Sequence, residues 1–392
     1  MTESPKIATT AKKRLAVFLD GTWNNVGDDT NVWRLKSLCA PMGTDGLAQL
    51  VYYERGLHGF LGGALGVGLD QDIKDAYQWL TEQYDPGDDI FIFGFSRGAY
   101  TARSLAGFIA KCGLLKSGGP LGVKQLYDRY RRADARTIWA LLDACNNGTL
   151  GDCTLEETWM IKYSMAIHIK LVGVWETVGA LGVPLFSVAG ISHQFLTTGL
   201  RRPIDFGFHA MAIDEHRRAF SPTLWTVKDN ENPDPDAAPP RPLSSVEQRW
   251  FVGAHANVGG GYASDLLPQI PLRWLMKKAS LHGLAFRNDV ELDGDALKAS
   301  IADSYRAFLH GVYRFFSRPY YRRIGEPPAP DKDGASSSNV NETIDASVFA
   351  RWNSDPGYRP QNLKDWEARH HVHISSLKVS VLADTPDVQA PD

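Results

Sequence analysis

The sequence Gly94-Phe95-Ser96-Arg97-Gly98 places a serine between two glycines, directly after an apolar segment of strand length at residues 90–93. A helix-forming segment follows at once and runs to about residue 112. A serine in a sharp turn between a buried strand and a helix has its hydroxyl raised to the edge of a sheet. Flanking glycines remove side chains that would collide with the neighbouring backbone. The pattern therefore predicts that Ser96 is a nucleophile.

A serine hydroxyl needs a base to accept its proton, and that base needs an acid to orient it. In enzymes with this type of turn, the chain order is serine, acid, histidine. Glu176 comes directly after an expected strand at residues 168–175 and lies between apolar neighbours, which makes it the first candidate for the acid. Asp205 and Asp214 are the alternatives.

His255 is the first candidate for the base. It follows an expected strand at residues 246–253 and precedes three consecutive glycines, which allow a loop to approach a site closely. The alternatives among the other histidines are His58, His209 and His216.

A serine nucleophile that attacks a carbonyl also needs two N–H donors for the oxyanion. The backbone amide of Arg97, the residue after the nucleophile, is expected to supply the first. The second is expected from Gly21 or Thr22, because the loop after an early strand at residues 15–19 contains both. The Asp20 carboxylate is a candidate for bracing that loop.

Further elements are expected on both sides of these residues. A strand is predicted at residues 50–53, and helices are predicted at 70–84, 97–112 and 268–284, with a mainly helical segment at 123–167. Strands that alternate with helices indicate parallel crossovers, so the expected fold class is α/β, with a mostly parallel central sheet flanked by helices. We expect a catalytic domain over residues 14–325 with a helical insertion at about 116–165, then a linker and C-terminal extension over 326–392 that begins with a stretch rich in Pro, Ser and Asp.

The composition is that of an ordinary globular protein. The 392 residues are 43% hydrophobic and 22% charged, and the net charge of −3 gives no electrostatic reason to expect nucleic-acid binding. No apolar run approaches the roughly 18 residues of a transmembrane helix. The four cysteines have no zinc-site spacing, and we expect no metal or other cofactor.

Two phosphate-related functions are disfavoured. Residues 18–22 contain the end of the D-x-D-G-T pattern, but Phe18 occupies the position where phosphatases with that pattern carry their nucleophilic aspartate. The glycine-rich segment at residues 59–68 lacks the Lys-Ser/Thr pair that a nucleotide-binding P-loop requires.

Four blocks together resemble a known family: LAVFLDGTWNN at residues 15–25, GFSRGAYTARSLAGFI at 94–109, LVGVWETVGALGVP at 171–184 and WFVGAHANVGGGY at 250–262. They are similar to the α/β-hydrolase domain family typified by the type VI secretion lipase effectors, over roughly residues 14–285. The resemblance implies an α/β-hydrolase-like fold and a cofactor-independent hydrolase of carboxylic esters, with phospholipid as the best-known substrate class. It implies Ser96 as nucleophile, Glu176 as acid and His255 as base.

The chain departs from the family pattern at two places. The family usually has Asp where this chain has Glu176, and it usually has Ser-Asp where this chain has Ala256-Asn257 after the histidine. Asn257 is a candidate for supporting the site in place of that carboxylate.

The sequence therefore predicts a serine hydrolase acting on a small-molecule ester or lipid through an acyl-enzyme, without nucleic acid and without an integral membrane segment, although transient contact with a membrane surface is compatible. The alternative is an interaction or scaffold domain that keeps the fold with weakened catalysis, motivated by the two departures. No signal peptide precedes the first strand, so the cytoplasm is the default expectation, with export by a signal-independent secretion system as the alternative. A secreted effector and a housekeeping enzyme both fit.

Overall fold

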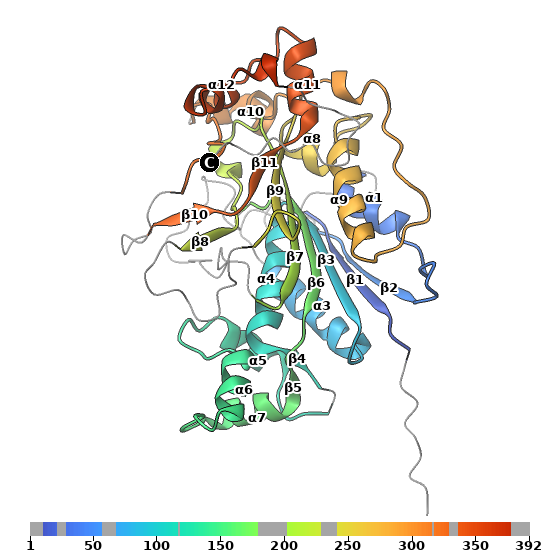
Figure 1. The fold of residues 1–392 in the computed structure, drawn as a ribbon, viewed down its shortest axis with the longest axis vertical. Helices are drawn as coiled ribbons and strands as arrows, with labels where there is room; N and C mark the ends of the chain where they lie inside the picture. The colour runs from blue at the N-terminus through green and yellow to red at the C-terminus, as the bar shows by residue number, and fades with distance from the viewer. Residues whose placement is uncertain are drawn as a thin grey trace, which may run out of the picture.

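The computed structural model describes residues 11–21, 29–56, 68–116, 118–178, 202–228, 241–315, 317–328 and 336–377. A seven-stranded sheet runs through this part of the chain in the order β11-β9-β7-β6-β3-β1-β2 (Figure 1). Every pair of neighbouring strands is parallel, which confirms the predicted α/β fold class with a mostly parallel central sheet. The strands are β1 (Arg14–Leu19), β2 (Gln49–Glu54), β3 (Asp89–Phe95), β6 (Ile169–Trp175), β7 (Ile204–Ala212), β9 (Val246–Phe251) and β11 (Glu342–Ile344).

Helices cover both faces of the sheet, with α1 (Asn31–Leu38) and α9 (Gln269–Leu281) on one face and α3 (Leu69–Gln83) and α4 (Arg97–Cys112) on the other (Figure 1). Strand β1 shows why both faces must be covered. Its residues Leu15, Val17 and Leu19 pack with α3 and α4, and the intervening Ala16 and Phe18 pack with α1 and α9. Successive side chains of a strand point to opposite faces, so an entirely apolar strand requires a helical layer on each side.

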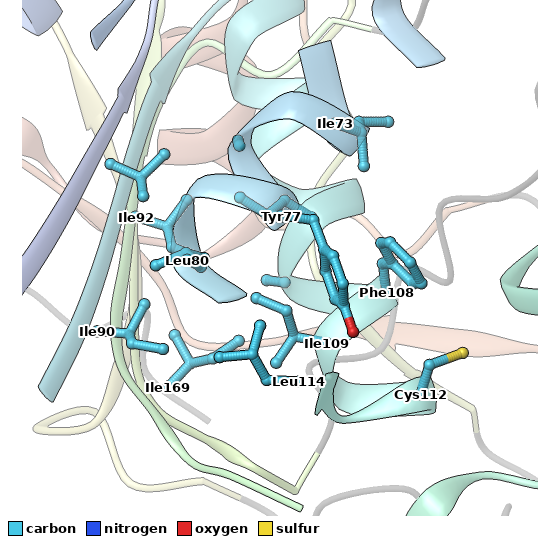
Figure 2. Packing of buried hydrophobic residues seen from close by; sticks show 14 of the residues in the cluster. Ile73, Tyr77, Leu80, Ile90, Ile92, Phe108, Ile109, Cys112, Leu114 and Ile169 are labelled. Carbon is cyan, nitrogen blue, oxygen red and sulfur yellow. The ribbon is translucent and has the colours of Figure 1, made fainter. Parts of the chain in front are cut away.

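The layer formed by α3 and α4 is held by close apolar packing (Figure 2). In α3, the predicted helical spacing is confirmed, because Ile73, Ala76, Tyr77 and Leu80 are all buried. The Tyr77 ring stacks on the Phe108 ring of α4 with their centroids 4.1 Å apart, and the Tyr77 hydroxyl donates a hydrogen bond of 2.9 Å to the carbonyl of Gly113. This packing fixes α4 against the sheet and thereby fixes the turn that precedes it.

The segment expected to be mainly helical contains α5 (Val123–Tyr130), α6 (Ile138–Asn146) and α7 (Leu155–Tyr163). A short antiparallel pair joins the chain before α5 to the chain after α7. Its strands are β4 (Leu114–Leu115) and β5 (Ser164–Met165). Figure 1 shows these helices at one end of the molecule. At the opposite end lie α8 (His255–Gly259), α10 (Ser304–Ala307), α11 (Ala346–Ser354) and α12 (Gln361–Arg369).

Residues that follow α9 in the chain pack at the edge of the sheet formed by β9 and β11. The parallel strand β11 extends the sheet next to β9, and a second short pair joins β8 (Thr226–Lys228) to β10 (Ser337–Asn339). Phe349 of α11 and Trp366 of α12 are buried in one cluster with Trp250 of β9. The predicted domain boundary at residue 326 stays a prediction. The remaining elements here are α10 (Ser304–Ala307), α11 (Ala346–Ser354), α12 (Gln361–Arg369) and the 3-10 turns η4 (Ala296–Lys298), η5 (Phe308–Gly311), η6 (Tyr313–Phe315) and η7 (Ile374–Ser376).

Candidate active site

Ser96 lies between the end of β3 and the first residue of α4, in a backbone conformation that non-glycine residues rarely adopt (φ 57°, ψ −119°). Such a conformation costs on the order of 1–3 kcal/mol and persists only where the surroundings impose it. Here they do, because a Cβ at Gly94 would overlap the backbone of Gly98, and a Cβ at Gly98 would overlap the carbonyl oxygens of Leu19 and Asp20. The two glycines thus let α4 start in contact with the end of β1, with the serine at the edge between them.

The structure brings Ser96, His255 and Glu176 together in one chain of hydrogen bonds. Ser96 Oγ lies 2.9 Å from His255 Nε2, and His255 Nδ1 lies 2.8 Å from Glu176 Oε2. An ionised carboxylate can only accept, so the Nδ1 proton is donated to Glu176 and Nε2 is left to accept the serine proton. The three side chains come from the carboxyl ends of β3, β6 and β9, which meet at one edge of the parallel sheet.

Glu176 follows β6 directly and is fully buried. Its carboxylate accepts four hydrogen bonds: one from the Ala212 amide (2.7 Å), two from the Arg322 guanidinium (2.7 and 2.8 Å) and one from His255. Burial alone would raise the pKa of Glu176, but the Arg322 charge and the hydrogen bonds outweigh it and lower the pKa to about 2. Each of the two carboxylate oxygens of Glu176 therefore accepts two hydrogen bonds.

His255 is the first residue of α8 (His255–Gly259), and its imidazole lies between the rings of Phe95 and Phe220, with centroids 4.9 and 5.1 Å away. Burial lowers the pKa of His255 below its ordinary 6.5 and outweighs the opposing effect of Glu176. The imidazole is therefore neutral at physiological pH, as a proton acceptor must be.

A second buried carboxylate, Glu215, holds the backbone of His255. Its Oε2 accepts the His255 amide at 3.2 Å and the Ser304 hydroxyl at 2.9 Å, and the Arg217 guanidinium binds both of its oxygens at 2.8 Å. Burial would raise the pKa of Glu215, but the Arg217 hydrogen bond and charge lower it to about 2. The start of α8 is thus tied to a carboxylate that is ionised at neutral pH.

The backbone amides expected to bind the oxyanion differ in whether they already donate a hydrogen bond within the protein. The Arg97 amide is in the first turn of α4, where no carbonyl four residues earlier in the helix can accept it. The Gly21 amide donates to its neighbour Asp20 at 2.7 Å, and Asp20 also accepts Tyr53 at 3.0 Å and Thr30 at 2.6 Å. Thr22 lies outside the described residues.

The alternative acids and bases are occupied elsewhere. Asp205 is near the start of β7 and pairs with His168 at 3.0 Å, whereas Asp214 accepts the Gly253 amide and the Tyr358 hydroxyl. His209 is buried in the core and accepts the Thr177 amide, and His216 contacts the Tyr320 carbonyl. His58 lies outside the described residues.

Asn257 supports the site without touching Ser96 or the His255 ring in any hydrogen bond. Its Oδ1 accepts the amides of Ala254 and Ala302 at 2.9 and 3.0 Å, and its Nδ2 donates to Asp265 at 2.7 Å. The asparagine at this departure from the family pattern thus links the turn before His255 to the chain that follows α9.

Two residues that contact this site were not among the expected ones, Arg322 and Glu215. Arg322 is an arginine in a run of arginines and aromatic residues, a pattern that gives no indication of a buried partner. Glu215 belongs to a charged stretch with Asp214, Arg217 and Arg218. This stretch follows an apolar alternation at residues 204–212, which is a signal for a strand that ends just before Glu215.

Within the ranges that the structure covers, no group of three or more His, Cys, Asp or Glu side chains is arranged to hold a metal ion. No helix in those ranges combines the length and apolar character needed to cross a bilayer.

A parallel sheet with helices on both faces and a serine, a histidine and an acid at its carboxyl edge defines an α/β-hydrolase-like protein. The chain belongs to the family described as "T6SS, Phospholipase effector Tle1-like, catalytic domain", whose sequence model matches residues 13–278, more than half of the chain. The resemblance seen in the four sequence blocks is thereby confirmed.

Three individual proteins are similar to this chain. Uncharacterized protein YEL023C of Saccharomyces cerevisiae is 26% identical over 325 residues, covering 70% of this chain and 44% of that protein. A crystal structure of an uncharacterized protein from Pseudomonas aeruginosa has 16% identity and a TM-score of 0.39, covering 70% of this chain and 46% of the other. The Tle1 effector bound to the VgrG spike from the type 6 secretion system has 18% identity and a TM-score of 0.35, covering 64% and 51%. The chain thus spans about half the length of the relatives it matches.

Proposed function

We propose that the protein is a serine hydrolase that cleaves carboxylic esters of phospholipids through an acyl-enzyme. The observation that carries the proposal is the continuous chain of hydrogen bonds from Ser96 Oγ through both nitrogens of His255 to Glu176. Membership of a family described as phospholipase effectors supports the substrate class.

In the first step, Ser96 Oγ attacks the ester carbonyl carbon while His255 Nε2 accepts the hydroxyl proton. The tetrahedral intermediate collapses, the bond to the leaving alcohol breaks, and the alcohol takes the proton from His255. Water then attacks the acyl-serine with His255 again as base, which releases the carboxylic acid and restores the serine. Glu176 holds the imidazole in the tautomer that leaves Nε2 free to accept, and it stabilises the imidazolium in both steps.

The oxyanion forms beside the first turn of α4, where the Arg97 amide and the positive end of the helix favour negative charge. We propose Arg97 as one donor. The Gly21 amide donates a hydrogen bond to Asp20, so its participation requires that this hydrogen bond be exchanged for one to the oxyanion. Thr22 is proposed as the alternative second donor.

Aromatic residues connect the site to an exposed apolar surface. Phe220, which contacts the His255 ring, packs on Phe308, and Phe308 packs on Tyr313, with centroids 5.5 and 5.4 Å apart. Beside Tyr313, the side chains of Val312 and Phe315 are 47% and 73% exposed. These two exposed apolar side chains flank the last ring of the series that begins at His255, and they support a substrate presented at a lipid surface.

The proposal is tested with the Ser96→Ala variant on a fluorescent phospholipid and on a p-nitrophenyl ester. We expect wild-type protein to hydrolyse both and to be labelled by a fluorophosphonate. The variant should lose labelling and at least 10³-fold in kcat, with unchanged circular dichroism and melting temperature. Ser280→Ala, at an exposed serine of α9, is the matched control and should behave as wild type.

Two outcomes would reject the proposal. Folded wild-type protein that neither reacts with the probe nor hydrolyses either ester would favour the alternative of a scaffold domain with lost catalysis. A Ser96→Ala variant as active as wild type would show that hydrolysis occurs by another route.

A further inference from the structure

The acid of the proposed triad is bound to a cation from outside the segment that the family model matches. Both terminal nitrogens of Arg322 donate to Glu176, Nη1 to Oε1 at 2.7 Å and Nη2 to Oε2 at 2.8 Å. This is the planar two-bond arrangement in which arginine binds carboxylates most strongly. The two side chains are 1% and 0% exposed, so the pair is isolated from solvent.

The guanidinium is itself fixed by the fold. Nη1 donates to the carbonyl of Ala212 and Nη2 donates to the carbonyl of Phe220, both at 2.6 Å. The Ala212 amide in turn donates to Glu176 Oε1 at 2.7 Å. Arg322 is thus held in one orientation by the end of β7 and by η3 (Arg218–Phe220), and it presents a rigid fork to the carboxylate.

We propose that Arg322 is a positioning residue of the active site, which keeps Glu176 ionised and aimed at His255 and thereby makes the segment after residue 278 part of the catalytic unit. This inference rests on the proposed hydrolase function.

The argument follows from the burial of Glu176. A carboxylate removed from water is strongly destabilised in its charged form unless a counter-charge and hydrogen bonds replace the water. Without Arg322, the Ala212 amide and His255 would be the hydrogen-bond donors left to it among the residues that the structure describes. The carboxyl would then hold its proton into the neutral range, as buried glutamates with pKa values of about 8–9 do. A protonated Glu176 stabilises the His255 imidazolium far less.

The other charged or titratable groups around Glu176 do not replace Arg322. His255 and His209 both have lowered pKa values because of burial, and they are neutral at pH 7. Glu215 and Arg217 form a pair of opposite charges with each other. Within the described ranges, Arg322 is therefore the permanent cation in direct contact with the carboxylate.

The test is the pH dependence of kcat/KM in Arg322→Met and Arg322→Lys, measured on a p-nitrophenyl ester between pH 5 and 10. In Arg322→Met we expect the acidic limb to move up to the raised pKa of Glu176. Activity at pH 7 should fall by about 10- to 100-fold and recover towards pH 10, because one pKa unit above the assay pH corresponds to about a tenfold loss of the ionised form. In Arg322→Lys the charge remains without the two-bond fork, so we expect a smaller shift.

Two further variants separate this role from a structural one. Arg351→Met is the matched control, because Arg351 is also buried and donates to the Ala299 carbonyl, yet makes no hydrogen bond to Glu176 or His255. It should lower the melting temperature and leave the pH profile of wild type. The double variant Glu176→Gln/Arg322→Met contains no titratable acid at this place, so the recovery at high pH should vanish.

The outcomes are distinct. An active wild type together with unshifted acidic limbs in both Arg322 variants would overturn this inference and leave the proposed hydrolase function standing, and so would a recovery at high pH that persists in the double variant. A wild-type protein inert to esters and to fluorophosphonate would overturn the proposed function and this inference with it.

Discussion

Replacing Glu176 with aspartate tests how closely the site is fitted to the longer side chain. Removing one methylene withdraws the carboxylate by about 1.5 Å, the length of a carbon–carbon bond. The Ala212 amide, Arg322 and His255 donate to the carboxylate at 2.7–2.8 Å from different parts of the fold, so a withdrawn carboxylate cannot keep all of these bonds. A bond in line with the shift would stretch to about 4 Å and cease to be a hydrogen bond. We therefore expect aspartate to be the worse acid at this position.

The expected magnitude follows from the bond to His255. A hydrogen bond to a charged group contributes about 1.5–3 kcal/mol, and each 1.36 kcal/mol of transition-state stabilisation corresponds to a factor of ten in rate. Loss of this bond should therefore lower kcat/KM of Glu176→Asp by about 10- to 150-fold. The lengthened contacts to Arg322 should also lower the free energy of unfolding, because the buried charges become poorly compensated.

The assay is kcat/KM on a p-nitrophenyl ester at pH 8, with unfolding by urea measured in parallel. Glu342→Asp is the matched control: Glu342 accepts Trp250, Gly325 and Asn339 but makes no hydrogen bond to His255. That variant should lose stability and keep wild-type kcat/KM. If Glu176→Asp retained more than half of the wild-type kcat/KM, the backbone after β6 would adapt freely, and the geometric reasoning would be wrong.

Two further predictions concern the surface and the core. Phe315→Ser should reduce hydrolysis of phospholipid in vesicles several-fold and leave hydrolysis of a soluble ester unchanged. Leu281→Ser, at a side chain 79% exposed at the far end of α9, should change neither rate, and equal losses in both variants would argue against a lipid-facing surface around Phe315. Burial lowers the pKa of His209 from 6.5 to about 3, so below pH 6.5 the unfolded chain binds a proton that the native protein does not. Stability should therefore fall as the pH drops from 6.5 towards 3, by at most about 1.4 kcal/mol per pH unit from this group. Urea unfolding of His209→Gln should show a shallower fall, and an identical slope would contradict this account.

The sequence predicted the parts of the fold in which local pattern and burial agree. The helix after Ser96 was expected to run to about residue 112 and ends at Cys112. The apolar strand before it and the strand ending at Trp175 are also present. Such elements are readable because a strand buried on both faces must be apolar throughout, and because a helix on the sheet repeats its apolar positions every three or four residues.

Sequence reasoning also selected Glu176 and His255 from several candidates, and the structure places both beside Ser96. It did not identify Arg322, because a buried ion pair depends on two side chains 146 residues apart meeting in three dimensions. The role of Glu215 cannot be read from the sequence for the same reason, because its partners include the backbone amide of His255, forty residues later. Contacts of this kind leave no periodicity in the chain.

The wide separation of Arg322 from the other site residues has a consequence for biosynthesis. During translation, the serine, the acid and the histidine leave the ribosome well before the arginine does. On the proposal made above, a nascent chain that ends shortly after α9 holds every reacting group while its acid lacks a counter-ion. Full hydrolytic competence then arrives only after Arg322 has been synthesised and has bound Glu176, which delays any attack on lipids of the cell that makes the protein.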